Sequence, residues 1–398
     1  MEYDMKERLV RARSAVQQHG WKQLFIRSYG HLTGFKLIEN IYLSDDRIIT
    51  RDNLQCVSNS IIPFDQSNVV ELTPAVYTEE CAHITRLVGK HIIHQPFIAE
   101  VSNVRLIGPE ALAVMPDNRY ILENSRGQID ALSDSIGRSI LTLLQNKKQN
   151  EKLDSAVSLV GPYMAGSPNY YHWIVDYLSK IQGIKKYEEI RNEEMKILIP
   201  NNPPNWMRSS LELLDVWDQT VEWDKKSTTV EKLVIPTGTY TPIHLTDYQI
   251  VSPSRLLWLK NNMCKNIDLD DTYPKYVYIS RNDADSRRII NENELIDSLP
   301  DHFESYELSK LSLIEQIRLF SEAEIIVGPH GAGLTNMIWG DNLHVLELWA
   351  NNRKSGCFYS MAQSLGHKYS ALECKSIKND MIVNVDAVMD MISSILDK

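Results

Sequence analysis

Three segments of this sequence combine side chains that could do chemistry. The first is Asn169-Tyr170-Tyr171-His172-Trp173-Ile174-Val175-Asp176, in which His172 and Asp176 lie four positions apart. On a helix this spacing puts both side chains on one face. A carboxylate orients a neighbouring imidazole and raises its basicity, which suits a general base acting on a hydroxyl. The alternative is a packing cluster, with Asn169 as the helix cap and His172 bonded to a backbone group.

The second segment is the run 326–336, Ile-Val-Gly-Pro-His-Gly-Ala-Gly-Leu-Thr-Asn. A β-branched run ends there in a turn with three glycines, and a helix follows. Glycine lets a ligand approach the backbone, and a helix N-terminus offers N–H groups to an anion such as a diphosphate. The run matches neither the P-loop nor the dinucleotide fingerprint GxGxxG. A tight turn without a ligand is the alternative.

The third segment is Tyr278-Ile279-Ser280-Arg281, with Arg287 and Arg288 a few residues further on. Arg281 directly follows a predicted strand, where its planar fork of donors could hold a diphosphate. A local ion pair with Asp283 or Asp285 is the alternative for Arg281. Because Arg287 and Arg288 are adjacent, we expect at most one of them to face a ligand.

Acidic residues near these segments give one further candidate and little support for a metal. Glu347 lies in the apolar run 345–349, where a carboxylate is costly unless it is paired or functional. It could take ribose or sugar hydroxyls, or it could lie at an exposed strand end. The triplet Asp283-Ala284-Asp285 comes closest to a divalent-ion motif, but the arginines beside it would repel a cation. We therefore expect neither a metal nor a cofactor.

The elements that must position these residues alternate between strand and helix from about residue 150 onward. The predicted strands are Ala156–Val160, Lys196–Ile199, Lys232–Ile235, Tyr276–Ser280, Phe303–Tyr306, Ile325–Val327, Val345–Leu348 and Tyr369–Leu372. The predicted helices are Tyr170–Ile184, Asn205–Val216, residues 252–267, Glu292–Ser298, Leu313–Ala323, Leu334–Trp339, Phe358–Ser364 and Ala387–Leu396. Such alternation predicts parallel sheets covered by helices, with ligands beyond the carboxyl ends of the strands.

The first third of the chain has a different pattern. Residues 36–130 predict a β-rich region with separate strands at Phe97–Val101 and Asn103–Ile107, and a hairpin whose tip is Asp117-Asn118. Residues 5–28 predict a basic amphipathic helix, which either lies on an anionic membrane surface or packs its apolar stripe on the next domain.

Composition narrows the class of protein. The 398 residues are 43% hydrophobic and 24% charged, which predicts two or three globular domains. The formal net charge of −10 argues against a general nucleic-acid binder. Five scattered cysteines without a CxxC pair suit a reducing compartment. The sequence has neither a stretch of about 18 apolar residues nor a signal-like N-terminus, so we expect a cytoplasmic protein.

These segments together resemble glycosyltransferase family 61. The likeness rests on Gly328–Asn336 preceded by Gln316–Ala323, on Tyr278–Arg281 with Arg288–Glu292, and on the His-Trp-x-x-Asp motif within Asn169–Asp176. The three motifs follow the family's order and span about 169–349, with weaker likeness from about 96. Because no signal anchor is evident in the sequence, the chain looks like a prokaryotic cytoplasmic member.

The resemblance implies a fold and a reaction. The implied fold is α/β with two tandem Rossmann-like domains, called GT-B. The expected segments are a basic helical segment over 1–35, an acceptor-side domain over 36–250, a linker helix over 251–272 and a nucleotide-sugar-binding domain over 273–398. The implied reaction is inverting and metal-independent, and a UDP-sugar is the favoured donor.

The resemblance also assigns expected roles to residues. The expected base is Asp176 or His172, with His330 as the rival. The expected donor-binding residues are Arg281, Arg288, Gly331, Ala332, Gly333, Leu334, Thr335, Asn336, Tyr306 and Glu347.

The expected function is a hexosyl- or pentosyltransferase of surface polysaccharide or lipid-linked glycan synthesis, held at the inner face of the cell membrane through residues 5–28. One rival interpretation is a transferase of another phosphate-linked group, which would call for a catalytic metal. The other is a non-catalytic nucleotide-sugar-binding scaffold, which would have no need of a base.

Overall fold

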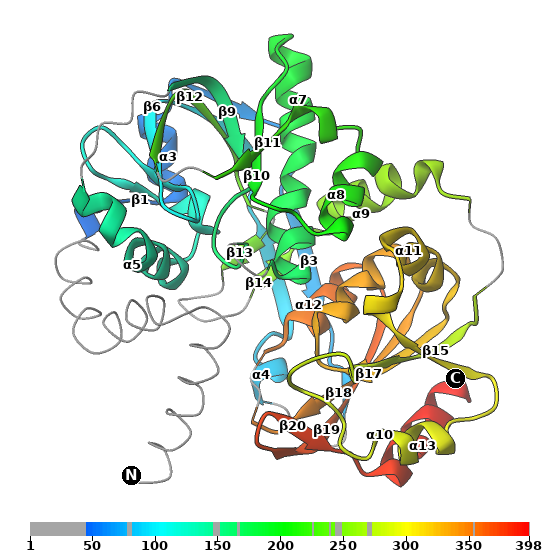
Figure 1. Ribbon diagram of the computed structural model, residues 1–398. Helices are drawn as coiled ribbons and strands as arrows, with labels where there is room; N and C mark the ends of the chain where they lie inside the picture. The colour runs from blue at the N-terminus through cyan, green and yellow to red at the C-terminus, as the bar shows by residue number, and fades with distance from the viewer. Residues whose placement is uncertain are drawn as a thin grey trace, which may run out of the picture.

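The computed structural model of the chain describes residues 45–77, 82–145, 152–164, 168–224, 227–238, 240–242, 249–268, 273–352 and 355–397. Within these ranges the fold is mixed α/β, with two large sheets and two small ribbons. Figure 1 shows the blue-to-green N-terminal sheet and the mostly yellow-to-red C-terminal sheet as two neighbouring bodies. The helix predicted over residues 5–28 lies outside the described residues. None of the described helices combines the length and the apolar character needed to cross a bilayer.

The β-rich region and the first α/β region share one sheet. Its strands are β1 (Ile48–Ile49), β2 (Ser60–Pro63), β6 (Phe97–Ile107), β7 (Leu112–Val114), β8 (Tyr120–Ile121), β9 (Lys152–Ser158), β10 (Ile197–Pro200), β11 (Thr220–Trp223) and β12 (Ser227–Pro236). Their order is β1-β8-β7-β6-β12-β9-β10-β11, with β2 beside β6. Strands β12, β9, β10 and β11 are parallel, and β6 joins them antiparallel to β12.

The described N-terminal part of the chain also contains helices. They are α3 (Arg51–Val57), α4 (Ala82–Thr85), α5 (Ile129–Gln145), α6 (Tyr170–His172), α7 (Ile181–Arg191), α8 (Asn205–Leu213) and α9 (Pro253–Met263). Of these, α4 lies beside the C-terminal sheet (Figure 1). The single helix predicted over 170–184 is wrong in detail, because α6 passes into a π turn over Trp173–Tyr177 and a 3-10 turn over Leu178–Lys180 before α7. Single π turns of this kind are frequent at functional sites.

Two predictions for the strands are corrected and one is confirmed. The segments predicted as separate strands at 97–101 and 103–107 form the single strand β6, because Asn103 stays in the strand with a φ of 56°. Strand β11 was not predicted, since most of its residues are polar or exposed. The predicted hairpin is confirmed: β7 pairs antiparallel with β8, and Asn118 at its tip has a φ of 65°.

The C-terminal sheet has the strand order of a doubly wound domain. Its strands are β4 (Val76–Tyr77), β15 (Tyr276–Ser280), β16 (Phe303–Glu307), β17 (Ile325–Pro329), β18 (His344–Ala350), β19 (Lys368–Ile377) and β20 (Asp380–Ile382). Strands β16-β15-β17-β18-β19 follow that order and run parallel. The order reverses at β15 and β17, and ligands of such sheets bind beyond the carboxyl ends there.

Helices cover both faces of the C-terminal sheet, as predicted. They are α10 (Glu292–Ser298), α11 (Leu313–Glu322), α12 (Cys357–Ser364), α13 (Val385–Leu396) and the 3-10 helix Ala332–Trp339. Apolar residues of α10 and α13 pack with one face of the strands. Residues of α11, α12 and the 3-10 helix pack with the other face.

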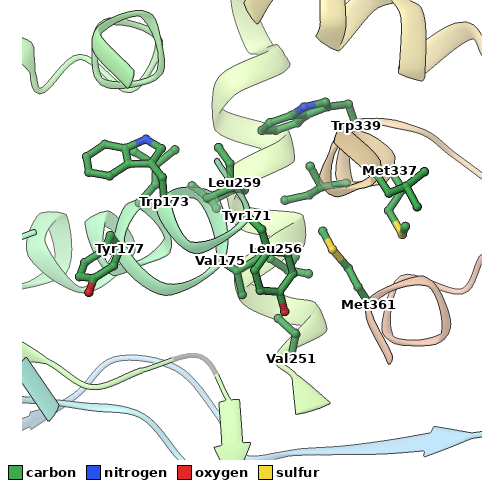
Figure 2. Packing of buried hydrophobic residues seen from close by; sticks show 14 of the residues in the cluster. Tyr171, Trp173, Val175, Tyr177, Val251, Leu256, Leu259, Met337, Trp339 and Met361 are labelled. Carbon is green, nitrogen blue, oxygen red and sulfur yellow. The ribbon is translucent and has the colours of Figure 1, made fainter. Parts of the chain in front are cut away.

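The two parts of the chain interlock. Strand β4, from the N-terminal part, pairs parallel with β19 and so crosses the predicted domain boundary. Two ribbons complete the fold: β3 (Asn68–Leu72) with β5 (Gly89–Ile93), and β13 (Tyr240–Pro242) with β14 (Gln249–Val251). One apolar core runs through both parts, and Figure 2 shows Tyr171, Leu256 and Trp339 within it. The contact between the parts is therefore a packed interface.

Candidate active site

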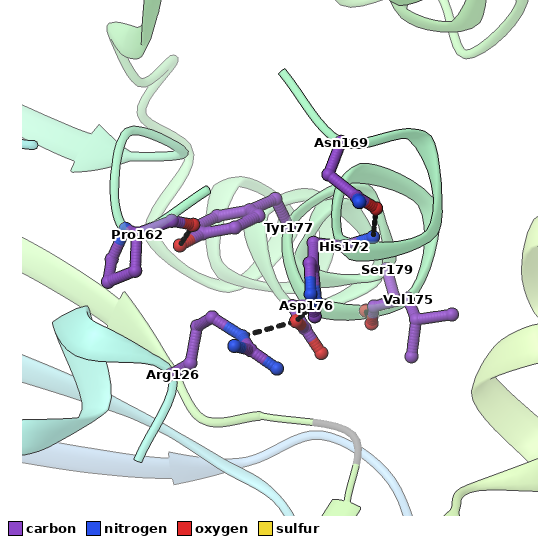
Figure 3. Close-up of polar contacts among 8 residues, drawn as sticks. All are labelled: Arg126, Pro162, Asn169, His172, Val175, Asp176, Tyr177 and Ser179. Atoms are coloured by element: carbon purple, nitrogen blue, oxygen red, sulfur yellow. Dashed lines mark hydrogen bonds and ion pairs between the residues drawn. The ribbon is translucent and has the colours of Figure 1, made fainter. Parts of the chain in front are cut away.

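The π turn after α6 holds a histidine–carboxylate pair. Nδ1 of His172 lies 2.8 Å from Oδ2 of Asp176, and Nε of Arg126 donates to the same oxygen (Figure 3). Burial alone would raise the pKa of Asp176, but Arg126 and His172 outweigh it and hold this pKa below its usual value. The ionised carboxylate therefore accepts the Nδ1 proton of a neutral His172, which leaves a lone pair on Nε2.

Aromatic rings fix the orientation of His172. Tyr163 stacks on the imidazole with ring centroids 4.3 Å apart, and Tyr171 meets it edge-on at 5.3 Å. Asn169 caps the helix as predicted, since its side chain accepts from the His172 N–H at 3.2 Å. Burial lowers the pKa of His172, and the charge of Arg126 adds to this, although Asp176 opposes it. The side chain of His172 is 19% exposed and that of Asp176 only 1%, so His172 is the member of the pair that an acceptor could contact.

Arg126 is a member of this cluster that the sequence analysis missed. It follows the 3-10 turn Leu122–Ser125 in the left-handed conformation, with a φ of 63°. Its guanidinium lies over the Tyr163 ring at 4.9 Å as well as against Asp176. The only local signal was an arginine before Gly127 in a turn, which is common on protein surfaces.

A guanidinium lies against the glycine turn at the point where the C-terminal strand order reverses. Arg281 directly follows β15, and Gly331 comes two residues after β17. A Cβ atom on Gly331 would lie 2.0 Å from Nη1 of Arg281. The φ of Gly331 is 179°, which any residue can adopt, so the role of glycine here is to leave the Arg281 guanidinium in its place.

The turn also presents backbone donors, although fewer than predicted. The N–H of His330 is bonded to the Leu348 carbonyl at 2.8 Å, and that of Leu334 to the Gly331 carbonyl at 3.0 Å. Within the described residues, the N–H groups of Gly331, Ala332 and Gly333 have no hydrogen-bond acceptor. The anion-binding part of the predicted run therefore narrows to these three N–H groups beside Arg281.

The two adjacent arginines face different ways. Arg287 has a φ of 61°, and its Nη1 donates to the His330 carbonyl at 3.3 Å, so it braces the glycine turn. Arg288 points to β20 instead, where its Nη2 donates to Asp380 at 2.8 Å. Only one of the pair faces the turn, as predicted, but it is Arg287 and not Arg288.

Replacing Arg288 with alanine is expected to leave nucleotide affinity unchanged. The side chain is 47% exposed, and loss of an exposed ion pair should cost less than about 1 kcal/mol of stability. Isothermal titration with a nucleoside diphosphate and a thermal melt of the variant check both parts. A clear loss of affinity would return Arg288 to the donor site.

A second histidine–carboxylate pair lies on the C-terminal side. Nδ1 of His330 bonds to Oε1 of Glu347, and the Tyr369 hydroxyl donates to Oε2 of Glu347 at 2.6 Å. Because Glu347 is buried with both oxygens in use, it orients His330 instead of facing a donor sugar as predicted. Phe358 contacts His330 edge-on at 5.1 Å and Tyr171 at 5.6 Å. Ring contacts through Tyr171 and Phe358 thus connect His172 to His330.

Four other predicted donor-binding residues have side chains that are buried or bonded elsewhere. Leu334 and Thr335 are buried in the protein interior. The Asn336 amide accepts from Tyr170 at 2.6 Å and from Trp339 at 2.9 Å, and it donates to Gln316 at 2.9 Å. The Tyr306 hydroxyl donates to Glu304 at 2.9 Å. The side chain of Asn336 therefore joins the two parts of the chain, and none of the four is directed at a donor.

Replacing Tyr170 with phenylalanine should lower stability by about 1 kcal/mol, because the hydrogen bond that joins the two parts is lost. The same change at Tyr306, whose hydroxyl bonds to the exposed Glu304, is the matched control and should have a smaller effect. Comparison of the two melting temperatures tests this prediction. Equal shifts would mean that the Tyr170 hydroxyl does not stabilise the interface.

The loop after β15 also carries the aspartates considered for a metal. Asp283 and Asp285 are exposed there, while Arg281 donates to the Ser286 carbonyl at 3.4 Å. Across the residues that the structure describes, no three His, Cys, Asp or Glu side chains gather closely enough to hold a metal ion.

Comparison with known proteins matches this region. The model of the Glycosyltransferase 61 family matches residues 170–346, which include His172, Asp176, Arg281 and the glycine turn. A segment of 100 residues is 32% identical to the EGF domain-specific O-linked N-acetylglucosamine transferase of Gallus gallus, and it covers 23% of this chain and 18% of that protein. The proteins of the same name from Bos taurus and Mus musculus are 32% and 31% identical over 100 residues, with 19% of each covered.

These matches support a glycosyltransferase. The aligned segment spans less than a fifth of each vertebrate relative, so the similarity concerns this segment and not the whole of either protein. They lend no support to the prokaryotic origin expected above. Arg126 and Glu347 lie outside the matched residues 170–346. Arg126 nevertheless donates to Asp176 of the first histidine pair, and Glu347 is the partner of His330 in the second.

Proposed function

We propose that this chain is an inverting, metal-independent glycosyltransferase of the GT-B type, which moves a sugar from a nucleotide-sugar donor to an acceptor hydroxyl. The observation that carries the proposal is the position of Arg281 against Gly331, with the His172–Asp176 pair two rings away. The doubly wound C-terminal sheet and the parallel strands β12-β9-β10-β11 support the GT-B assignment.

The donor side would bind and stabilise the leaving group. The guanidinium of Arg281 and the N–H groups of Gly331, Ala332 and Gly333 would contact the diphosphate. These donors are held in place before the reaction, and they gain strength as negative charge builds on the leaving oxygen. In this proposal they do the work that a divalent ion does in other transferases.

The acceptor side would supply the base. Nε2 of His172 would take the proton of the acceptor hydroxyl while the oxygen attacks the anomeric carbon from the face opposite the diphosphate. Asp176 would keep the Nδ1 proton and stabilise the imidazolium that forms. One displacement of this kind inverts the anomeric centre. His330 is the rival base, since it carries the same kind of pair with Glu347.

The biological setting is a further part of the proposal. We infer a role in surface polysaccharide or lipid-linked glycan synthesis, at the cytoplasmic face of a membrane. A UDP-sugar is the favoured donor, and the names of the vertebrate relatives make N-acetylglucosamine the first sugar to test.

The test is a thermal-shift screen of the protein against UDP, GDP, CDP and dTDP, each with and without EDTA. We expect one nucleotide to raise the melting temperature in EDTA, and Arg281→Ala to abolish the effect. The matching nucleotide-sugar should then be hydrolysed or transferred by the wild type. Binding that requires a metal would favour transfer of another phosphate-linked group, and binding without any turnover would favour a scaffold.

A further inference from the structure

Behind the His172–Asp176 pair lies a buried charged group that the proposed reaction does not use. Lys180 follows Asp176 by four positions, as Asp176 follows His172. Only 3% of Lys180 is exposed. The charges that act most on its ammonium are those of Glu123 and Asp176, followed by Arg255 and Arg126. Its ammonium therefore lies within this group.

Lys180 differs from the other members because it lacks a polar partner. Arg126 pairs with Asp176, and Glu123 accepts from the Gly238 N–H at 3.4 Å and faces Arg51 at 3.7 Å. Arg255 donates to the carbonyls of Thr237 and Ser179. The contact found for the Lys180 ammonium in the described chain is the Tyr177 ring at 5.5 Å, with no hydrogen bond or ion pair to a described residue.

The charges that the structure describes in this group do not balance. Among the described residues it contains four cations, Arg51, Arg126, Lys180 and Arg255, and three carboxylates, Asp65, Glu123 and Asp176. Arg255 bonds only to carbonyls, and Lys180 is the member with neither a hydrogen bond nor an ion pair to any described residue. Burial lowers the pKa of the Lys180 ammonium, although Glu123 and Asp176 oppose this, and an anion bound beside the ammonium would keep it charged.

The group lies where a ligand of the N-terminal sheet is expected. Arg126 comes from the segment after β8, Tyr163 from the segment after β9, and Gly238 from the segment after β12. Strands β9 and β12 are parallel neighbours, so the segments of Tyr163 and Gly238 leave the same edge of the sheet. Strand β8 runs the other way, and Arg126 reaches this edge through its contact with Tyr163. In the proposed function this is the acceptor side, next to His172.

We propose that Lys180, beside Arg126, binds an anionic group of the acceptor, next to the hydroxyl that His172 deprotonates. The group is a carboxylate of an acidic sugar or a phosphate, since either would supply the missing charge. The inference rests on the proposed function and adds the chemical class of the acceptor.

The experiment separates this anion site from the donor site. In an Arg281→Ala background, the melting temperature is measured at constant ionic strength with glucuronate, inorganic phosphate or glucose. We expect glucuronate or phosphate to stabilise the protein and glucose to have no effect, and the responding anion distinguishes an acidic sugar from a phosphate. Adding Lys180→Met should lower the affinity for the responding anion at least about tenfold. Adding Lys186→Met, the same change at a more exposed lysine paired with Glu189, should leave the response unchanged.

The proposal fails if neither anion stabilises the Arg281→Ala protein. It also fails if Lys180→Met binds the responding anion as well as Lys186→Met does. Lys180→Gln is the second variant should the methionine variant not fold, and it should weaken binding of the responding anion in the same way. Nucleotide binding by the wild type is measured separately, so failure of the donor site can be told apart from failure of the anion site.

Discussion

Replacing His172 with alanine is expected to lower kcat by about 10²- to 10⁴-fold, the usual contribution of a general base. Nucleotide affinity should stay unchanged, because the printed hydrogen bonds of His172 go to Asn169 and Asp176 and not to the glycine turn. The measurement is a sugar-transfer assay with saturating donor, together with calorimetric titration of the nucleoside diphosphate. The loss in kcat without a loss in binding separates a base from a residue that only supports the fold.

The alanine variant of His330 is the matched comparison. His330 has the same arrangement with a buried carboxylate, but it lies beside Arg287 and the glycine turn. We expect its replacement to weaken nucleotide binding as well as turnover. If His330→Ala alone abolishes turnover while His172→Ala remains active, the assignment of the base is reversed.

The pH profile gives a second and more specific test of the same pair. A base must be neutral to act, so kcat/KM rises with pH through the pKa of His172. Burial lowers this pKa from its usual value of 6.5, which places the acidic limb below that pH. Asp176 raises the pKa of His172, so Asp176→Asn should move the limb to lower pH and reduce the plateau. Arg126 lowers it, so Arg126→Gln should move the limb to higher pH. A limb that stays fixed in both variants would mean that another group titrates.

Local signals in the sequence were sufficient for most of the C-terminal elements. Strand β15 and helix α10 have the predicted bounds, Tyr276–Ser280 and Glu292–Ser298. The start of α11 was predictable because Ser312 and Glu315 form a capping box, a signal that spans only four residues. Buried strands flanked by such caps can be identified from their own residues, without reference to the rest of the chain.

The partners of the site residues could not be predicted in this way. Arg126 lies 50 positions from Asp176, and the contact depends on a left-handed residue at the end of a short turn. Glu347 was correctly identified as costly, but its partners His330 and Tyr369 come from two other segments. The pairing of β4 with β19 joins residues almost 300 positions apart. Local periodicity carries no information on such contacts, so the sequence identified chemically important residues more reliably than it assigned their roles.

Replacing Gly331 with alanine should weaken nucleoside diphosphate binding by about 10- to 100-fold, although the change removes no charge and no donor. The added Cβ would lie 2.0 Å from Nη1 and 2.8 Å from Cζ of Arg281, so the guanidinium must leave its place. The backbone itself should tolerate alanine, because the φ of Gly331 is 179°. Calorimetric titration measures the affinity, and circular dichroism checks that the variant is folded.

The double variant identifies the cause of that loss. If Gly331→Ala acts only by displacing Arg281, it should have no further effect in an Arg281→Ala background, and the two losses will not add. Gly333→Ala is a second comparison, because its Cβ would meet the flexible end of Leu308 at 2.7 Å and not Arg281. That variant should lose stability more than affinity. Additive losses for Gly331 and Arg281 would show instead that the Gly331 backbone contacts the diphosphate independently, and the reason for glycine at this position would then be close approach of the ligand.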